Sequence, residues 1–160
     1  MLNIKIICVG KLKEKHYADA AAEYARRLGP LCRLEIEELP ESRLPASPGE
    51  AETAAALKKE AESIALRIPP GAVVTALCIE GSQMDSVRFS KFIDMCAVSG
   101  KSRLCFIIGG SCGLDEEIKK RADLRLSMSK MTFPHHLARV MLLEQLYRAF
   151  KISEGSKYHK

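Results

Sequence analysis

The chain has 160 residues, of which 47% are hydrophobic, and a formal net charge of +5. These values predict a single domain over residues 1–160 with a complete apolar core, and they exclude a disordered chain. The mild positive charge permits a polyanionic partner without requiring one. No stretch is apolar enough to span a membrane, and the first ten residues are too interrupted for a signal peptide. We therefore expect a cytoplasmic protein with no membrane partner.

The six cysteines lack the spacing of a metal site. No two of them form a Cys-x-x-Cys pair, and no histidine stands at zinc-finger spacing from them. Cys8, Cys78 and Cys105 lie in apolar runs, where a free thiol behaves as a small hydrophobic group. We therefore expect reduced cysteines in the core, no disulfide framework and no bound metal.

Strands and helices are predicted to alternate along the whole chain. Apolar runs and alternating patterns predict five strands, at residues 3–9, 31–39, 72–79, 104–108 and 124–128. Apolar residues at helical spacing predict five helices, near residues 17–28, 48–68, 89–96, 115–121 and 136–152. This alternation predicts a three-layer α/β sandwich around a mainly parallel sheet of five to six strands.

Two local patterns refine this prediction. The strand at 31–39 carries charges on one face, which is typical of a strand near an edge, whereas those at 72–79 and 104–108 are apolar on both faces. Ser47 and Glu50 fit a capping box, with Pro48 as the first residue of the second helix.

A glycine-rich loop, Gly109 to Gly113, follows a buried strand and precedes a helix. Open α/β sheets bind ligands at such places, and adjacent glycines allow a ligand to approach the backbone closely. The loop matches neither the dinucleotide-binding fingerprint nor a P-loop, which disfavours a nicotinamide or ATP site. A tight turn with no ligand explains the spacing equally well.

The segment 127–136, SMSKMTFPHH, joins the last strand to the last helix. Its methionines, phenylalanine and hydroxyl groups suit an adenine-like heterocycle. A hydrophobic staple at the start of a helix is the alternative, and the residues alone favour it.

The last helix is apolar on more than one side. This pattern predicts that the helix is buried on two sides and that a second subunit covers one of them. The alternative is a central core helix in a monomer. The residues involved are Leu137, Val140, Met141, Leu143, Tyr147 and Phe150. The tail after Gly155 is expected to fray, although its Tyr and His side chains also suit contacts with a nucleic-acid base.

The last third of the chain carries several motifs in a fixed order. They are FIIGGS-x-G from Phe106, LS-x-SKMTFPH from Leu126, RV at Arg139, EQLYRA from Glu144 and G-x-x-YH from Gly155. With these motifs the chain resembles the RlmH family, the SPOUT-class methyltransferases of a pseudouridine N3 in 23S ribosomal RNA. The resemblance covers the whole chain. The sequence differs from the family pattern at Cys112 and in the helix after Gly81, and both differences lie outside the matched cofactor segments.

The resemblance implies a homodimer, a trefoil knot in the C-terminal part, and the cofactor S-adenosylmethionine held by three loops. The implied substrate is 23S rRNA within the assembled ribosome. The cofactor-binding residues carried over to this chain are Leu77, Ile79, Gly109, Gly110, Gly113, Met128, Ser129, Lys130, Met131, Thr132 and Phe133.

A dry pocket lined by apolar side chains of these loops would favour a methyl transfer that annihilates charge. We expect its wall to include Leu77, Ile79, Met131 and Phe133. The same dryness keeps the target N3 protonated, so a nearby cation or base must compensate. The candidate catalytic residues are His135, Arg139, Tyr158 and His159.

Two other functions compete with this one. A non-enzymatic ribosome-associated RNA-binding protein would not need an adenosine pocket. A knotted methyltransferase acting on tRNA is disfavoured, because such enzymes usually add an RNA-binding module and this chain has no residues to spare for one.

Overall fold

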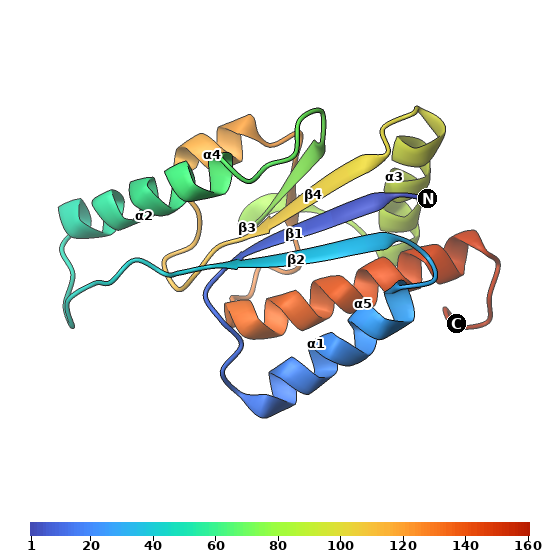
Figure 1. Cartoon of the computed structure of the whole chain (residues 1–160), viewed down its shortest axis with the longest axis horizontal. Helices are drawn as coiled ribbons and strands as arrows, with labels where there is room; N and C mark the ends of the chain where they lie inside the picture. Colours follow the sequence, from blue (N-terminus) through green and yellow to red (C-terminus); the bar gives the residue numbers. More distant parts are fainter.

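The computed structural model describes residues 1–160 as five strands that alternate with five helices (Figure 1). The strands are β1 Asn3–Val9, β2 Arg33–Leu39, β3 Val73–Gln83, β4 Arg103–Ile108 and β5 Leu124–Ser127. The helices are α1 Lys15–Leu28, α2 Glu50–Ala65, α3 Ser86–Val98, α4 Glu116–Arg121 and α5 His135–Ser153. None of these helices has the length and hydropathy needed to cross a membrane.

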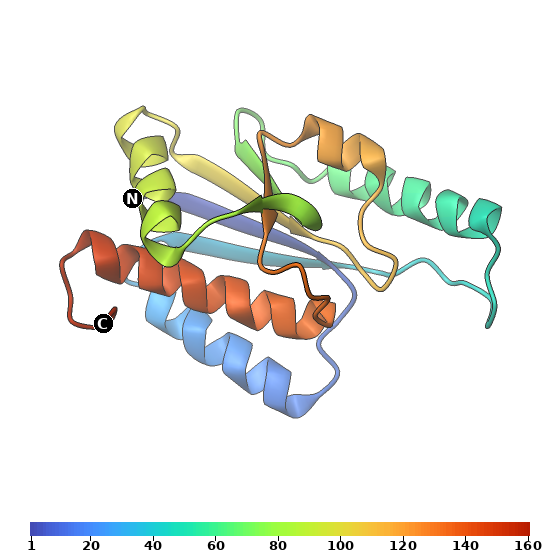
Figure 2. The same cartoon turned by 180° about the vertical axis from the view of Figure 1, so that it is seen from behind.

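All strand pairs are parallel, in the order β2-β1-β4-β3-β5. Helices α1, α3 and α5 pack on one face of the sheet, and α2 and α4 pack on the other (Figures 1 and 2). Alternate residues of β4 enter the two cores: Phe106 faces α3 and α5, and Ile107 faces α2 and α4. The predicted three-layer α/β sandwich is confirmed, with five strands.

β2 is an edge strand, as its charged face predicted. Lys5 on β1 reaches two of its carboxylates, with Nζ 3.0 Å from Glu35 and 2.7 Å from Glu37. Because β1 and β2 run in register, Lys5 lies directly opposite Glu35, and Glu37 follows two residues further along the same face of β2.

Helix α5 lies between α1 and α3 on one face of the sheet (Figure 2). Leu142, Leu143 and Leu146 on this helix are completely buried. Helices α1 and α3 of the same chain thus flank α5 on two sides, while Val140, Met141 and Tyr147 stay only partly buried. The expectation that a second subunit covers part of this helix stays a prediction, as does the homodimer.

Helix α2 begins two residues later than the capping-box pattern predicted. Gly49, not Ser47, is the N-cap residue. Its backbone N–H donates to Glu52 Oε1 at 3.3 Å, and its carbonyl accepts the first helical bond from Thr53 at 3.0 Å. The side chain that caps this end is thus the glutamate inside the helix, which reaches back to the glycine.

Strand β3 continues four residues beyond its predicted end at Ile79 and makes a detour next to β5. Leu126 on β5 pairs with both Leu77 and Ser82, so residues 78–81 bulge out of the sheet. Gly81 closes the detour against β5, because an added Cβ would lie 2.8 Å from the backbone carbonyl of Arg125. The detour holds Ile79 beyond the edge of the regular sheet.

We predict that Gly81→Ala destabilises the fold. The added methyl group meets backbone rather than a flexible side chain, so the strands must separate, at a cost of about 1–3 kcal/mol. Urea unfolding of the variant and the parent chain measures this difference. Gly49→Ala is the matched control: its Cβ meets only Glu52 Oε1, at 3.7 Å, and its effect should stay below about 1 kcal/mol. Equal stability of Gly81→Ala and the parent would contradict the close contact.

Candidate functional site

A cavity of about 830 Å³ lies beyond the carboxyl ends of β3, β4 and β5. Its wall comes from three segments far apart in the sequence: residues 77–80, the glycine loop with the end of β4, and residues 126–136 with parts of α4 and α5. Parallel α/β sheets bind ligands at this edge because the loops that follow the strands meet there.

The cavity gathers most of the predicted cofactor-binding residues. Ten of the eleven line it: Leu77, Ile79, Gly109, Gly110, Gly113, Met128, Ser129, Met131, Thr132 and Phe133. Lys130 does not line the cavity and is exposed to solvent. The remaining residues of the segment 128–133 face the cavity while this lysine is left at the surface.

The glycine loop is a closed turn. Gly113 N–H donates to Gly110 O at 3.1 Å, and Gly113 has a φ of +78°, which favours glycine. A Cβ on Gly109 would collide with the carbonyl oxygen of Gly113. The tight turn considered from the sequence is therefore present, and its backbone also forms part of the cavity wall.

The segment between β5 and α5 is shaped by short-range bonds from two serines. Ser127 Oγ donates to Ser129 O at 3.0 Å, and Ser129 Oγ accepts from Met131 N–H at 3.0 Å. The turn leaves Met131 74% exposed, and Ile79 across the cavity is 48% exposed. The prediction of a dry pocket is thus wrong for the chain alone, because two of its four apolar wall residues meet solvent.

His135 begins α5 directly after Pro134 and lines the cavity. Burial and the neighbouring His136 lower the pKa of His135 below its ordinary value. The two imidazole rings lie 3.8 Å apart, and His136 stacks in turn on Tyr17 of α1. At neutral pH the cavity therefore has a neutral imidazole on its wall.

Arg139, one turn further along α5, is 3% exposed and does not line the cavity. Its Nη1 lies 2.7 Å from Glu38 Oε2, and its Nη2 donates to Gly10 O at 2.9 Å. Glu38 also accepts from Leu12 N–H at 3.1 Å. The guanidinium thus ties α5 to the end of β2 and to the segment that follows β1.

Tyr158 and His159 lie against the other half of α5. Tyr158 OH donates to Glu144 Oε1 at 3.1 Å, and His159 Nδ1 lies 3.3 Å from Arg148 Nη1. Burial and the Glu144 carboxylate raise the pKa of Tyr158 to about 12. The tail is therefore folded back on the helix rather than frayed. Within one chain, the four candidate catalytic residues form two separate groups.

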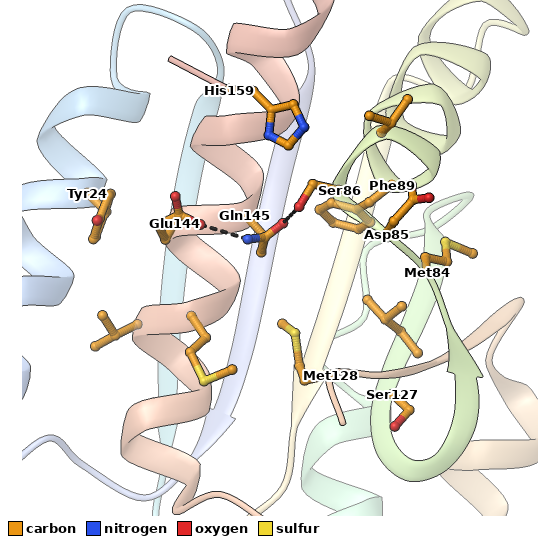
Figure 3. Close-up of a pocket in the computed structure, with 14 residues that line it drawn as sticks. Tyr24, Met84, Asp85, Ser86, Phe89, Ser127, Met128, Glu144, Gln145 and His159 are labelled. Atoms are coloured by element: carbon orange, nitrogen blue, oxygen red, sulfur yellow. Dashed lines mark hydrogen bonds between the residues drawn. The ribbon is translucent and has the colours of Figure 1, made fainter. Parts of the chain in front are cut away.

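A second cavity, of about 720 Å³, lies between α3, α5 and β5 (Figure 3). Ser86 Oγ donates to Gln145 Oε1 at 2.7 Å across it, and His159 stands at its wall (Figure 3). Leu126 and Met128 line both cavities. Its wall combines residues from five segments. Three of these segments carry family motifs, with Leu126, Gln145 and His159 among the wall residues, although the sequence did not show that they form one cavity.

The sequence indicated neither the hydrogen-bond partner of the glycine loop nor the exposure of the cysteine within it. Glu41, in the loop after β2, accepts hydrogen bonds from the backbone and side chain of Ser111. No local pattern could have found this contact, since the two residues are 70 positions apart.

Cys112 is exposed at the tip of the turn and is not a core residue, and all six cysteines are free. No three His, Cys, Asp or Glu side chains are grouped to hold a metal ion.

Comparison with known proteins agrees with this geometry. Residues 2–159 match a family model described as a predicted SPOUT methyltransferase. Ribosomal RNA large subunit methyltransferase H 1 of Clostridium perfringens is 48% identical over 99% of this chain and 100% of that protein. Ribosomal RNA large subunit methyltransferase H of Clostridium botulinum is 50% identical with the same coverage.

The fold also has a counterpart among solved structures. One described as a probable methyltransferase from Bordetella pertussis has a TM-score of 0.57 at 14% identity, over 92% of this chain and 96% of that one. The family model and the two relatives together span almost every residue of the chain, including all the motifs from Phe106 onward. The chain therefore belongs to the SPOUT methyltransferase family, in the RlmH group that its motifs resemble.

Proposed function

We propose that this chain transfers a methyl group from S-adenosylmethionine to N3 of a pseudouridine in the 23S rRNA of the large ribosomal subunit. One observation carries the proposal: three segments matched to the family's cofactor loops line a single cavity. The names of the two relatives support rRNA as the substrate. We further propose that the chain acts on assembled ribosomes, in the cytoplasm, as a homodimer with a knotted C-terminal part.

The cavity fits the proposed cofactor in size and lining. Its volume of about 830 Å³ is enough for a nucleoside carrying an amino-acid chain. Gly109 has no room for a side chain, so a ligand meets bare backbone there. Leu77 and Phe133 supply apolar surface beside it. When bound, S-adenosylmethionine supplies a methyl group activated by a sulfonium centre.

We propose His135 as the proton acceptor. It lines the cavity, and its lowered pKa keeps its imidazole neutral and able to accept a proton at neutral pH. Tyr158 is a weaker candidate because its raised pKa keeps the phenol protonated and its hydroxyl already donates to Glu144. Its proposed role, with His159, is to contact the rRNA.

We propose that the second cavity receives a neighbour of the target nucleotide, while the target base itself enters the cofactor cavity, where His135 lies. The two cavities share Leu126 and Met128, so a nucleotide bound in the second cavity would be held directly beside the cofactor cavity. His159 at its rim is placed to stack on or hydrogen-bond to a base.

Arg139 is proposed to position α5 rather than to act on the substrate. Two of its guanidinium nitrogens already bond to Glu38 and to Gly10 O, and the side chain is buried behind the cavity wall. By fixing α5, these bonds would hold His135, one turn away on the same helix, at the cavity.

The function is tested by titrating S-adenosylmethionine into the protein in a calorimeter and by mass mapping of rRNA from unmodified ribosomes incubated with labelled cofactor. We expect one new methyl group, on one pseudouridine of the large subunit. A chain ending at Ser156 should bind the cofactor within about threefold of the full chain, because the tail does not line that cavity, yet should not methylate.

Two outcomes would contradict these expectations. Absence of cofactor binding by the full chain would favour the non-enzymatic RNA-binding alternative. Full methylation by the shortened chain would refute the role of Tyr158 and His159.

The role of His135 predicts a pH dependence. As pH falls through its pKa, the imidazole takes up a proton and can no longer accept one, so the rate falls. Because that pKa is lowered, the loss should occur below the ordinary histidine value of 6.5. His135→Gln should lower kcat by about 10²–10⁴-fold and remove this acid limb. An identical limb in the variant would assign it to another group.

The role of Arg139 predicts a loss of stability. Arg139→Ala removes the guanidinium that bonds to Glu38 and to Gly10 O and should lower the free energy of unfolding by roughly 1–3 kcal/mol. Arg26→Ala is the control: its guanidinium is 73% exposed and pairs only with Glu23, so its effect should be within about 0.5 kcal/mol. If Arg139→Ala were fully stable but inactive, Arg139 would be a catalytic residue after all.

A further inference from the structure

The loop that follows β2 carries an ionised carboxylate that bonds to the glycine loop from outside the cavity. Glu41 Oε1 accepts from Ser111 N–H at 2.8 Å and, at shorter range, from Ser111 Oγ. Burial alone would raise the pKa of Glu41, but the two bonds from Ser111 and the nearby His135 and His136 hold it below its usual value. The carboxylate is therefore charged at neutral pH, which strengthens both hydrogen bonds.

The Glu41 carboxylate packs directly against Gly110 of the glycine loop. A Cβ on Gly110 would lie 2.7 Å from Glu41 Oε1 and 3.0 Å from its Cδ. Gly110 has no positive φ, so its backbone conformation does not require glycine. A side chain at this position would displace the Glu41 carboxylate and press on Val9, whose Cγ1 lies 3.2 Å from the position of the added Cβ.

The loop that carries Glu41 is itself held from the other side. Ser42 N–H donates to Glu60 Oε2 at 2.8 Å, and Glu60 on α2 is only 8% exposed. Adjacent residues of the loop are thus bonded in two directions, Glu41 to the glycine loop and Ser42 to α2. This arrangement fixes the position from which the Glu41 side chain extends.

Glu41 is not part of the cavity wall, whereas Ser111 and Gly110 are. An effect of Glu41 on a bound molecule must therefore pass through the glycine loop. We propose that Glu41 is a positioning residue that holds residues 109–113 in the shape that binds the cofactor, and so determines cofactor affinity. This inference rests on the proposed function, in which the same loop contacts S-adenosylmethionine.

The physical reason is the cost of ordering a glycine-rich segment. Three of its five residues are glycines, which lose more backbone freedom on ordering than other residues do. If the loop is already ordered in the free protein, that cost is met during folding and does not reduce the binding free energy. Its turn bond from Gly113 N–H to Gly110 O fixes the loop's ends, and Glu41 fixes its tip at Ser111.

The test combines calorimetry with amide hydrogen exchange on the full chain. Glu41→Ala should weaken S-adenosylmethionine binding about tenfold, the effect of losing a small number of hydrogen bonds. It should also speed the exchange of the Ser111 amide in the absence of cofactor, whereas kcat at saturating cofactor should stay near that of the parent. Glu41→Gln keeps an acceptor oxygen and should recover part of the affinity. Glu62→Ala, an exposed glutamate on α2, is the matched control and should change neither quantity.

A double-mutant cycle separates the bond from a general loss of stability. If Glu41 acts through Ser111, Glu41→Ala combined with Ser111→Ala should bind the cofactor no more weakly than Glu41→Ala alone. Fully additive losses in affinity would overturn the proposal. So would an affinity and a Ser111 exchange rate in Glu41→Ala equal to those of the parent, with the parent binding the cofactor normally. A parent chain that does not bind S-adenosylmethionine would instead overturn the proposed function, and this inference with it.

Discussion

The pairing of β5 with β3 is the constraint on which the site depends. Leu126 opposes both Leu77 and Ser82, so the four residues between them leave the sheet and rise over its carboxyl edge. The same pairing directs the chain after Ser127 toward that edge, where it forms the opposite wall of the cavity. A one-residue change of register would exchange the faces of β5 and bury its polar side chains. The cavity is thus a consequence of strand pairing, and the glycine loop after β4 completes it.

The second requirement is that α5 begins at a defined place, because His135 is its first residue. A helix held only by apolar contacts could shift along its axis at modest cost, since leucines pack against leucines in several registers. The buried guanidinium of Arg139 removes that freedom, because its partners are single atoms on Glu38 and Gly10. In some proteins buried charged pairs select one arrangement, because an unpaired charge left in the interior is costly. Under the role proposed for Arg139, the arrangement selected here is the one that places His135 at the cavity.

The sequence was sufficient for what depends on local pattern. Apolar periodicity located all five strands and five helices, because burial on one or two faces leaves a direct record in residue spacing. The cavity loops were found through ordered motifs shared with a family. What failed or was missed depends on contacts between distant residues. The partner of Arg139 lies 101 residues away and leaves no local pattern, and Glu41 attracted no notice for the same reason. The burial of α5 on more than one side was correctly predicted, but its contacts with α1 and α3 were not, since periodicity records burial without saying what covers it.

The exposure of Ile79 and Met131 shows that the cavity is open to solvent in the isolated chain. Two apolar side chains on opposite walls meet solvent in the isolated chain, although a methyl transfer between charged groups is favoured where water is excluded. The loops at this edge of the sheet leave both side chains uncovered. Under the proposed function, the rRNA substrate would be the surface that covers them and excludes water. Covering apolar side chains also contributes favourably to such an association, so binding of the substrate and completion of the site would be the same event.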